Sequence, residues 1–337
     1  MSNDLVLVTG GTGFLGTQVI LAFIEKGFRV RATARSDAKI SEWNAKYPHT
    51  KSLLEWAIVK DIITPGAFDE SIKGVTILAH TASPFHFNVK DNWNDMLLPA
   101  IQGTREALTA AKKTPSVKRV VVTSSFASMI NLLAPEGGKG IVYDDNTWNP
   151  VTKEQAIASD SGAFVYMASK KLAEEEAWII AKEPDTKFSL TTLCPPYIFG
   201  PPPEVLKSLD SLGTSVGMIW ALVDAKECKP NSGGPWVDVR DVAKAHVLAV
   251  TEDVAKGQRY HLSAGVFDDS TIADAIIRGV PEQAHRIPKA PVNPTPCAFT
   301  LDNRKVQREL GIKFIDFDTS VADTAKCLFE FERSLKA

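Results

Sequence analysis

The sequence predicts a doubly wound α/β fold, in which helices cover both faces of a parallel sheet. Three observations predict this fold. Short apolar runs alternate with helical patterns over roughly the first 190 residues. The apolar runs do not alternate with polar residues, which is typical of strands buried on both faces. The first run, Leu5–Thr9, ends directly in a cluster of glycines, and a helical pattern follows it.

The remaining elements follow in order along the chain. The first helix is expected over Phe14–Lys26, because Leu15, Val19, Ala22 and Phe23 fall on one helical face. Further apolar runs predict strands over Phe28–Thr33, Trp56–Lys60, Thr76–Ala79, Arg119–Thr123 and Ser189–Leu193, and helical spacing predicts helices around Leu97–Lys112 and over Tyr166–Ala181.

The character of the sequence changes after Cys194. Five prolines fall within Pro195–Pro203, and stretches rich in Ser, Gly, Thr or Pro follow with weaker periodicity. We therefore expect a main domain over residues 1–194, with residues 236–262 returning to it. A smaller C-terminal α/β lobe is expected over residues 195–235 and 263–337, packed against the sheet.

Composition and charge exclude several classes of protein. Hydrophobic residues make up 44% and charged residues 23%, and the net charge is −2, so we expect neither a nucleic-acid nor a membrane partner. No stretch reaches the roughly 20 apolar residues that span a bilayer, and we expect no signal peptide. The four cysteines form no CxxC pair, which favours reduced thiols in a cytoplasmic protein.

A glycine-rich loop joins the first predicted strand to the first predicted helix. Thr9–Gly16 (TGGTGFLG) reads as GxxGxxG through Gly10, Gly13 and Gly16, or as GxGxxG starting at Gly11. Such glycines allow a tight turn and a close approach of the backbone to a pyrophosphate, which the helix N-terminus then attracts. A glycine-rich turn without a ligand is the alternative. The flanking strand and helix favour a dinucleotide site of the Rossmann type.

The end of the second strand indicates which dinucleotide binds. A site for NAD usually has a carboxylate there to bind the ribose 2′-hydroxyl. Here Arg35 stands at the strand end, and Asp37 comes two residues later. The Arg35 guanidinium can hold a 2′-phosphate and Lys39 can add a second positive charge, which favours NADPH/NADP+; two solvated surface charges are the alternative. Asp61 and Ile62, after the third strand, are expected to flank the adenine.

Two further motifs carry the candidate chemistry. Tyr166 and Lys170 form YxxxK on a predicted helix, where a spacing of four places them on one face. The ammonium is expected to lower the pKa of the phenol, so that Tyr166 can donate a proton to a carbonyl oxygen. Ser124 and Ser125 follow the strand that ends at Thr123, where a hydroxyl can bond the same oxygen. A surface Tyr–Lys pair and a serine turn are the alternatives.

The combined motifs resemble those of a known family. The sequence resembles the extended short-chain dehydrogenases/reductases, and within them the yeast and fungal NADPH-dependent aldehyde/ketone (carbonyl, methylglyoxal) reductases related to dihydroflavonol 4-reductase. The resemblance covers nearly the whole chain. It is carried by Thr9–Gly16, Thr33–Ser36, His80–Phe85, Val122–Ser125, Trp148–Pro150, Tyr166–Lys170, Pro195–Pro201 and Val237–His246.

The resemblance implies a role for each matching position. Ser125 matches the catalytic serine, Tyr166 the proton donor and Lys170 its partner. The cofactor contacts that it implies are Gly10, Gly11, Thr12, Gly13, Phe14, Leu15, Arg35, Lys39, Asp61, Ile62, Tyr166, Lys170, Ile198 and Ser215. One position departs from the pattern, because Cys194 stands before Pro195 where the family often has asparagine. We expect Cys194 to be a buried structural thiol rather than a nucleophile.

The substrate pocket is the least defined part of the site. Aromatic residues follow or precede the predicted strand ends and are expected to form an apolar pocket, although core packing explains each of them equally well; they are Phe85, Phe87, Phe126, Phe164 and Tyr197. We interpret His86 and His246 as structural, because neither has a second ligand at metal spacing. Asp238–Asp241 is interpreted as a charge cluster that holds the small lobe to the sheet.

Together these features predict an NADPH-dependent, stereoselective reduction of aldehydes or ketones to alcohols, with no metal. The substrate is expected to be a small carbonyl compound, and the protein a monomer or a homodimer. Two alternatives share the fold. One is a nucleotide-sugar epimerase or dehydratase that retains NAD, which the proline-rich and aromatic C-terminal sequence disfavours. The other is a regulator that senses NADP without catalysis, which the intact Tyr166–Lys170 pair disfavours.

Overall fold

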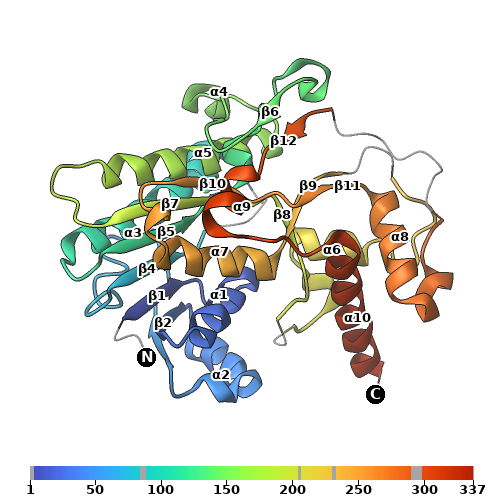
Figure 1. Cartoon of the computed structure of the whole chain (residues 1–337), viewed down its shortest axis with the longest axis horizontal. Helices are drawn as coiled ribbons and strands as arrows, with labels where there is room; N and C mark the ends of the chain where they lie inside the picture. The colour runs from blue at the N-terminus through green and yellow to red at the C-terminus, as the bar shows by residue number, and fades with distance from the viewer. Residues whose placement is uncertain (1–3, 84–88, 204–205, 230–232, 290–297, 337) are drawn as a thin grey trace.

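A central parallel sheet of seven strands organises the molecule (Figure 1). The computed structural model describes residues 4–83, 89–203, 206–229, 233–289 and 298–336. The strand order is β10-β7-β5-β4-β1-β2-β3 and every pairing is parallel. The strands are β1 (Leu5–Thr9), β2 (Arg29–Ala34), β3 (Leu54–Ile58), β4 (Ile77–His80), β5 (Arg119–Thr123), β7 (Ser189–Cys194) and β10 (Arg259–His261). The predicted doubly wound fold is confirmed.

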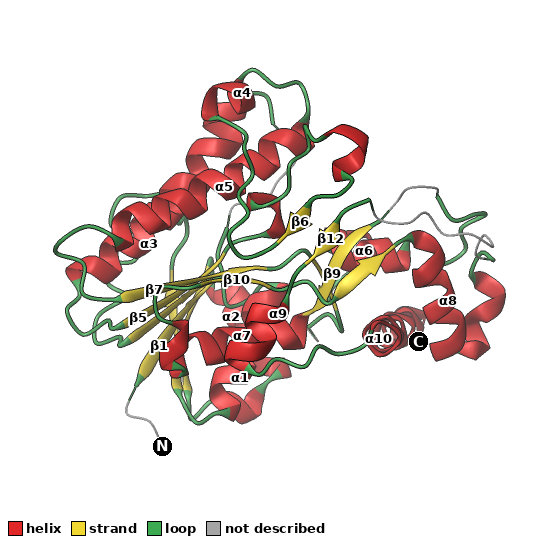
Figure 2. Cartoon of the chain, turned by 45° about the horizontal axis from the view of Figure 1, so that its top comes forward, coloured by secondary structure: helices red, strands yellow, loops and turns green. Residues whose placement is uncertain are grey.

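Helices cover both faces of this sheet, as Figure 2 shows. On one face lie α1 (Phe14–Glu25), α2 (Asp37–Lys46), α7 (Val239–Thr251) and α9 (Arg304–Leu310), and on the other α3 (Leu98–Lys113) packs against α5 (Gly162–Ala181). Alternate residues of β1 serve the two layers. Val6 and Val8 join the core beneath α1 and α7, whereas Leu5 and Leu7 join the core beneath α3 and α5. Burial on both faces explains the continuous apolar run of this strand.

A serine caps α5, whose start differs from the prediction, and another serine caps α2, which was not predicted. The α5 helix begins at Gly162, four residues before the predicted Tyr166, because the Ser161 side chain accepts a hydrogen bond from the backbone N–H of Phe164. The N-cap of α2 is Ser36, whose hydroxyl accepts from the N–H of Lys39.

The C-terminal part builds a second, smaller sheet beside the first (Figure 1). Its strands are β8 (Tyr197–Phe199), β9 (Gly234–Asp238) and β11 (Gly265–Phe267), with α6 (Thr214–Trp220), α8 (Asp269–Gly279) and α10 (Phe317–Lys336) packed around them. Thus β9 belongs to the small sheet, and the chain returns to the large sheet through α7 and β10. The division into two functional lobes stays a prediction.

Shorter elements complete the described chain. They are the strands β6 (Val142–Tyr143) and β12 (Thr300–Leu301), the helix α4 (Lys153–Ile157), a π-helical turn at Asn92–Leu97, and 3₁₀ turns at Pro48–Thr50, Phe126–Ser128, Pro135–Gly138, Leu209–Ser211, Asp253–Ala255 and Pro281–Arg286.

A buried charge cluster joins β9, α7 and α10. The fully buried Asp238 carboxylate accepts hydrogen bonds from the Arg240 guanidinium and from the Ser320 hydroxyl. Arg240 also pairs with Asp323 of α10 at 2.8 Å, and Asp241 accepts from the N–H of Ile315. These contacts tie the C-terminal helix to the start of α7. They support the interpretation of this segment as a structural cluster.

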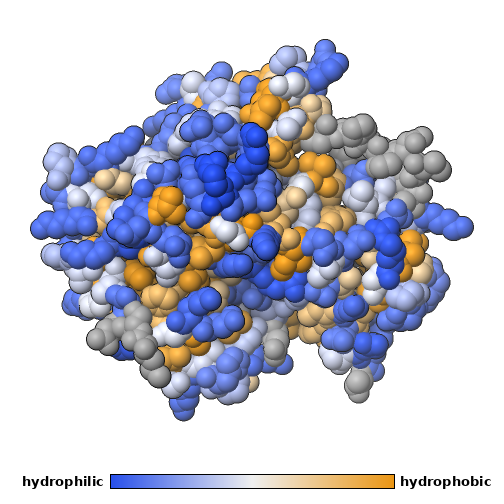
Figure 3. Space-filling view, viewed as in Figure 1, coloured by the Kyte–Doolittle hydropathy of each residue, from blue (hydrophilic) through white to orange (hydrophobic). Residues whose placement is uncertain are grey.

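The surface carries no dominant apolar region on the face drawn in Figure 3, where hydrophilic residues prevail and hydrophobic ones form separate small patches. Among the described residues, no helix is long and apolar enough to cross a membrane.

Candidate active site

The candidate site lies at the carboxyl edge of the sheet, between β1 and β4. In the strand order these neighbours mark the point where the chain reverses its direction of progress across the sheet. The glycine loop follows β1, and Ala82 and Ser83 follow β4. The two segments are in contact, because a Cβ at Gly10 would lie 3.1 Å from the Cα of Ala82. This edge is where ligands bind in open α/β sheets.

Backbone geometry accounts for two of the loop glycines. Gly10 has a φ of +69°, which side-chain-bearing residues rarely adopt, and its N–H donates to the Thr33 hydroxyl at 3.0 Å. A Cβ at Gly16 would overlap the carbonyl oxygen of Gly10. Gly16 therefore lets α1 start directly against the turn, as the third glycine of a dinucleotide motif does.

The start of α1 fits a phosphate group. Its N-cap residue is Gly13, which supplies no capping side chain, and no acidic residue lies in its first turn. The N–H groups of the first turn are therefore available to an anion, which the helix dipole also favours. Gly11 is buried, whereas Thr12 to Leu15 are at least partly accessible. The predicted pyrophosphate loop, residues Gly10 to Leu15, thus has the expected shape, and its role stays a prediction.

The predicted 2′-phosphate residues lie beside this loop. Arg35 is exposed at the carboxyl end of β2, and Lys39 is exposed on the first turn of α2. Glu42 lies on the same helix, with its carboxylate 3.8 Å from the Lys39 ammonium and 2.5 Å from that of Lys207. Cations therefore outnumber carboxylates here, which fits a dianionic phosphate.

The other predicted cofactor contacts lie after β3, and on β8 and α6 of the C-terminal part. Asp61 and Ile62 follow β3, the neighbour of β2; Asp61 is exposed, and Ile62 packs against Gly103 of α3. Ile198 and Ser215 lie 17 residues apart in sequence, yet the Ile198 N–H donates to the Ser215 hydroxyl at 3.3 Å. The structure thus brings together two residues that the sequence linked only by resemblance.

Ser125, Tyr166 and Lys170 converge at this edge. Ser125 follows β5, and a hydrogen bond joins its side chain to that of Tyr166. Tyr166 and Lys170 are one turn apart on α5, and the Lys170 ammonium lies 5.4 Å from the centre of the Tyr166 ring. The ammonium donates to the Ser83 hydroxyl at 2.6 Å. Sequence reasoning did not single out Ser83 as a partner of Lys170.

The pKa values of the trio correct one expectation. Burial raises the pKa of Tyr166 to about 12, the nearby Tyr197 adds to the rise, and the Ser125 hydrogen bond opposes it. Burial also lowers the pKa of Lys170 to about 8. The prediction that Lys170 lowers the pKa of Tyr166 is therefore wrong for this arrangement, in which desolvation dominates. Tyr166 is a neutral phenol at neutral pH, the form that can donate a proton.

Two buried histidines have structural partners. His80 ends β4, and its Nδ1 lies 2.9 Å from the Thr9 hydroxyl. The His246 ring nitrogens contact the Thr123 hydroxyl at 2.7 Å and the Val242 carbonyl at 2.8 Å. Burial lowers the pKa of each to about 4, so both are neutral. His86 lies outside the described residues, within which no three His, Cys, Asp or Glu cluster in a way that could hold a metal.

The aromatic residues predicted for the substrate pocket separate into different places. Phe126 is only 4% exposed; it stacks on His261 with ring centres 5.3 Å apart and packs against Tyr143 and Phe299. Its assignment to the pocket is wrong, because it belongs to the core. Tyr197 is 38% exposed and close enough to Tyr166 to raise the pKa of that phenol. Its role in substrate binding stays a prediction.

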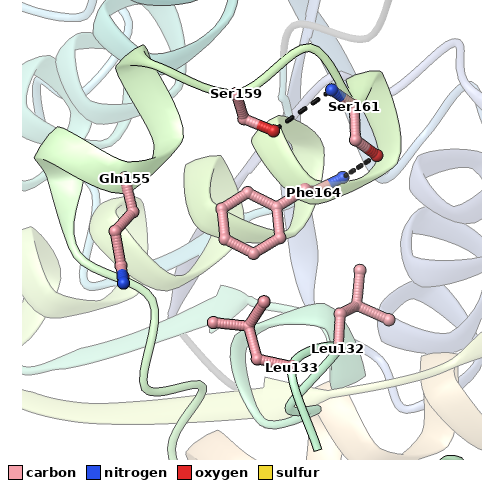
Figure 4. A pocket seen from close by; sticks show the side chains of 6 residues that line it. All are labelled: Leu132, Leu133, Gln155, Ser159, Ser161 and Phe164. Carbon is pink, nitrogen blue, oxygen red and sulfur yellow. Dashed lines mark hydrogen bonds between the residues drawn. The ribbon is translucent and has the colours of Figure 1, made fainter.

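Phe164 lines a different cavity, drawn in Figure 4. Its ring faces Leu132 and Leu133, and Gln155, Ser159 and Ser161 complete the described lining. Phe164 and Tyr166 are two positions apart on α5, a spacing at which side chains do not share a face. Within the described residues this lining includes none of Ser125, Tyr166 and Lys170. The role of Phe164 in substrate binding stays a prediction. Phe85 and Phe87 lie outside the described residues.

Cys194 behaves as the buried thiol that we expected. It is 0% exposed, and burial raises the pKa of its thiol to about 12, which keeps it protonated and unreactive. Its sulfur lies 3.7–3.8 Å from both carboxylate oxygens of Glu174. Sequence reasoning also missed Glu174; the available signal was its position on the helical face that Tyr166 and Lys170 share.

Comparisons with known proteins agree with this geometry. Residues 7–267 match the 3-beta hydroxysteroid dehydrogenase/isomerase family. Over all of both chains, the protein is 41% identical to a putative uncharacterized oxidoreductase of Schizosaccharomyces pombe. It is 37% identical to a putative NADPH-dependent methylglyoxal reductase of Candida albicans, over 96% of this chain and 98% of the relative.

A solved structure is similar over nearly its whole length. The yeast methylglyoxal/isovaleraldehyde reductase in complex with NADPH superposes with a TM-score of 0.88 at 31% identity, covering 98% of this chain and 99% of that one. The resemblance predicted from the sequence motifs is confirmed. The protein belongs to the 3-beta hydroxysteroid dehydrogenase/isomerase family, among the extended short-chain dehydrogenases/reductases.

Proposed function

We propose that the protein reduces aldehydes and ketones to alcohols with NADPH as the reductant. The observation that carries this proposal is the convergence of Ser125, Tyr166 and Lys170 at the sheet edge that also holds the glycine loop. The names of the relatives support it: two are NADPH-dependent methylglyoxal reductases, one of them putative, and others are a ketoreductase and an aldehyde reductase. The positive charges of Arg35 and Lys39 support NADPH over NADH.

The chain's own residues bind, orient and protonate the substrate. Ser125 and Tyr166 both present hydroxyl groups, so a carbonyl oxygen placed between them accepts two hydrogen bonds. Bound NADPH supplies a hydride to the carbonyl carbon. The phenol of Tyr166 then transfers its proton to the oxygen, which completes the alcohol. Solvent returns a proton to Tyr166, and Lys170 would hold the ribose of bound NADPH.

Burial keeps the phenol of Tyr166 in the acid form that carbonyl reduction uses. Alcohol oxidation needs a phenolate as base, whereas carbonyl reduction needs a phenol as acid. With the pKa of Tyr166 raised to about 12, the acid form prevails at neutral pH. The residues that bind the substrate therefore begin the reaction in the protonation state that reduction requires.

The substrate class follows from the surroundings of Tyr166. Tyr197 is half exposed beside it and packs edge-on against Phe267 with ring centres 5.6 Å apart. An aromatic wall of this kind suits an apolar carbonyl compound rather than a charged sugar nucleotide. Reduction against a fixed wall presents one carbonyl face to the cofactor, so the product alcohol has one hand.

The test is the loss of NADPH absorbance with purified protein and a panel of carbonyl compounds: an α-keto ester, an aryl ketone, methylglyoxal and a dihydroflavonol. NADH is assayed in parallel, and product chirality is measured by chromatography. We expect turnover with NADPH, little turnover with NADH and one enantiomer in excess. Tight NADPH binding without turnover of any compound would favour the alternative of a regulator that senses NADP without catalysis. A preference for NAD would favour the epimerase or dehydratase.

We also propose that the protein acts in the cytoplasm, as a monomer or a homodimer. Within the described residues, the thiols of Cys194 and Cys228 form no disulfide, which supports a reducing compartment. Fractionation of cells that express a tagged protein tests the location. Light scattering after size-exclusion chromatography gives the oligomeric state.

A further inference from the structure

A buried carboxylate lies behind the catalytic trio. Glu174 is on α5, four residues after Lys170 and eight after Tyr166, so the three side chains follow one face of the helix. Only 1% of Glu174 is exposed. Burial disfavours its charge, but Arg259 and several hydroxyl donors outweigh this cost, and the pKa of Glu174 stays below its usual value. Glu174 is therefore an anion in the interior.

Both oxygens of this carboxylate have hydroxyl partners. The hydroxyl oxygens of Ser124 and Ser128 each lie 2.6 Å from Oε2. The hydroxyl of Thr192, on β7, donates to Oε1 at 2.7 Å. Glu174 thus connects α5 to β7 and to the turn that follows β5.

Arg259 completes the network from the neighbouring strand β10. Its Nε donates to Glu174 at 2.8 Å, and its Nη2 donates to the Ser128 hydroxyl at 2.9 Å. Its Nη1 donates to the carbonyls of Asp145 and Thr147. The guanidinium also lies 4.0 Å from the centre of the Trp148 ring. All three nitrogens of the Arg259 guanidinium group therefore donate hydrogen bonds to fixed groups.

The network holds the turn that carries Ser125. Ser124 and Ser128 flank Ser125 in sequence, and both contact Glu174. The backbone of this turn is also fixed, because the Ser128 N–H donates to the Ser125 carbonyl at 2.9 Å. The residues on either side of Ser125 are thus tied to the helix that carries Tyr166. A buried ion pair is often no more stabilising than well-packed hydrophobic residues of similar volume. We therefore infer that the pair serves to fix the geometry of this turn.

We propose that the Glu174–Arg259 pair positions Ser125 against Tyr166 for proton transfer to the substrate. The proposal rests on the proposed reduction, which supplies the reaction in which this alignment matters. Glu174 and Arg259 are positioning residues. They touch neither substrate nor cofactor in this account, and they act through Ser124, Ser128 and the turn between them.

The first test is a double-mutant cycle between Glu174→Gln and Ser125→Ala. If Glu174 acts through Ser125, Glu174→Gln lowers kcat about tenfold or more in the wild-type background and by less than about twofold in the Ser125→Ala background. The dissociation constant for NADPH changes little. Equal losses of kcat in the two backgrounds would overturn the proposal, because they would mean that Glu174 does not act through Ser125.

Arg119→Gln is the matched control. Arg119 is also a buried arginine, at the other end of β5, where its Nη2 donates to the carbonyls of Ala249 and Glu252. We expect it to lower the melting temperature while kcat stays near the wild-type value. An equal loss of kcat in Arg119→Gln would assign the effect to general destabilisation and contradict the proposal.

A second readout does not depend on turnover. The ¹³Cζ resonance of Tyr166, assigned with Tyr166→Phe, reports on the hydrogen bond of the phenol. We expect Glu174→Gln to move it in the same direction as Ser125→Ala, whereas Arg119→Gln leaves it in place. An unmoved resonance in Glu174→Gln overturns the positioning role even if no substrate is found. If Glu174→Gln does not fold, Ser128→Ala takes its place, since that hydroxyl is one link between the carboxylate and the turn.

Discussion

The cofactor half and the substrate half of the proposed site are built in different ways. The cofactor half consists mainly of backbone: the turn of Gly10–Gly16, the start of α1 and the strand ends beside it. The substrate half consists of side chains from distant segments, such as Tyr197 after β7 and Tyr166 on α5. A backbone site is set by local sequence, whereas a side-chain site is set by packing. The first half should therefore be sensitive to glycine substitutions and the second to changes of shape.

The largest effect on the cofactor half is expected from Gly16→Ala. The new Cβ would overlap the Gly10 carbonyl, so the turn must shift away from the phosphates. We expect the dissociation constant for NADPH to rise by about 100-fold, as the loss of one or two hydrogen bonds to a charged phosphate would cause. Titration of NADPH by fluorescence measures it.

Gly162→Ala serves as the control for this substitution, since a Cβ there meets nothing within 4 Å. It should bind NADPH as the wild type does. Unchanged affinity in Gly16→Ala would contradict the view that backbone geometry makes the cofactor half.

Arg35→Gln should have the next largest effect. Loss of the guanidinium removes a charge-assisted hydrogen bond to the 2′-phosphate, worth about 1.5–3 kcal/mol or roughly 10–100-fold. We expect kcat/KM to fall by that factor with NADPH and to stay nearly constant with NADH. Steady-state kinetics with both cofactors measure the ratio. An equal loss with both would place Arg35 away from the 2′-phosphate.

Two aromatic substitutions sharpen the view of the substrate half. Tyr197→Ala removes the wall beside Tyr166 and should raise KM for the carbonyl compound about tenfold, since burial of an aromatic ring is worth at least that much. Phe126→Leu changes a buried ring in the core and should cost about 1 kcal/mol of stability with KM unchanged. Kinetics and thermal melts separate the two. A raised KM in Phe126→Leu would return that residue to the pocket.

The smallest predicted effect is a pH dependence from Lys170, whose pKa burial lowers to about 8. The ammonium loses its proton above that pH, so kcat/KM for NADPH should fall about fourfold between pH 7 and 8.5. The free energy of unfolding changes in the opposite direction. From pH 8 to about 10.5, Lys170 keeps its proton in the unfolded chain and has lost it in the folded chain, so the free energy of unfolding increases as pH rises.

Lys170→Met provides the comparison for both pH profiles. It should have a lower kcat/KM for NADPH that is flat across this range, and it should lack the gain in stability. A fall in kcat/KM that persists in Lys170→Met would assign the titration to another group.

The same contrast explains what sequence alone could predict. The predicted strand Arg119–Thr123 has the bounds of β5, because an apolar run between polar residues marks where the strand begins and ends. The glycine loop and the Tyr166–Lys170 pair are also local motifs, and they lie where we expected them. Phe126 was misassigned because its core partners Tyr143, His261 and Phe299 are distant in sequence.

Electrostatic surroundings were equally hard to predict. The pKa of Tyr166 depends on how much protein surrounds the phenol, and burial reversed the expected direction of its shift. The ion pair of Glu174 and Arg259 joins residues 85 positions apart in sequence, so no local pattern could predict it. Position along a strand or helix could thus be predicted, whereas the tertiary environment of a side chain could not.

The most direct test of the central claim is to measure turnover and NADPH binding in the Tyr166→Phe variant. Phenylalanine keeps the ring and removes the proton that reduction requires, while the cofactor half is left intact. We predict a fall in kcat of about 10²–10⁴-fold with a dissociation constant for NADPH close to that of the wild type. A variant that binds NADPH and still reduces the carbonyl at the wild-type rate would contradict the account.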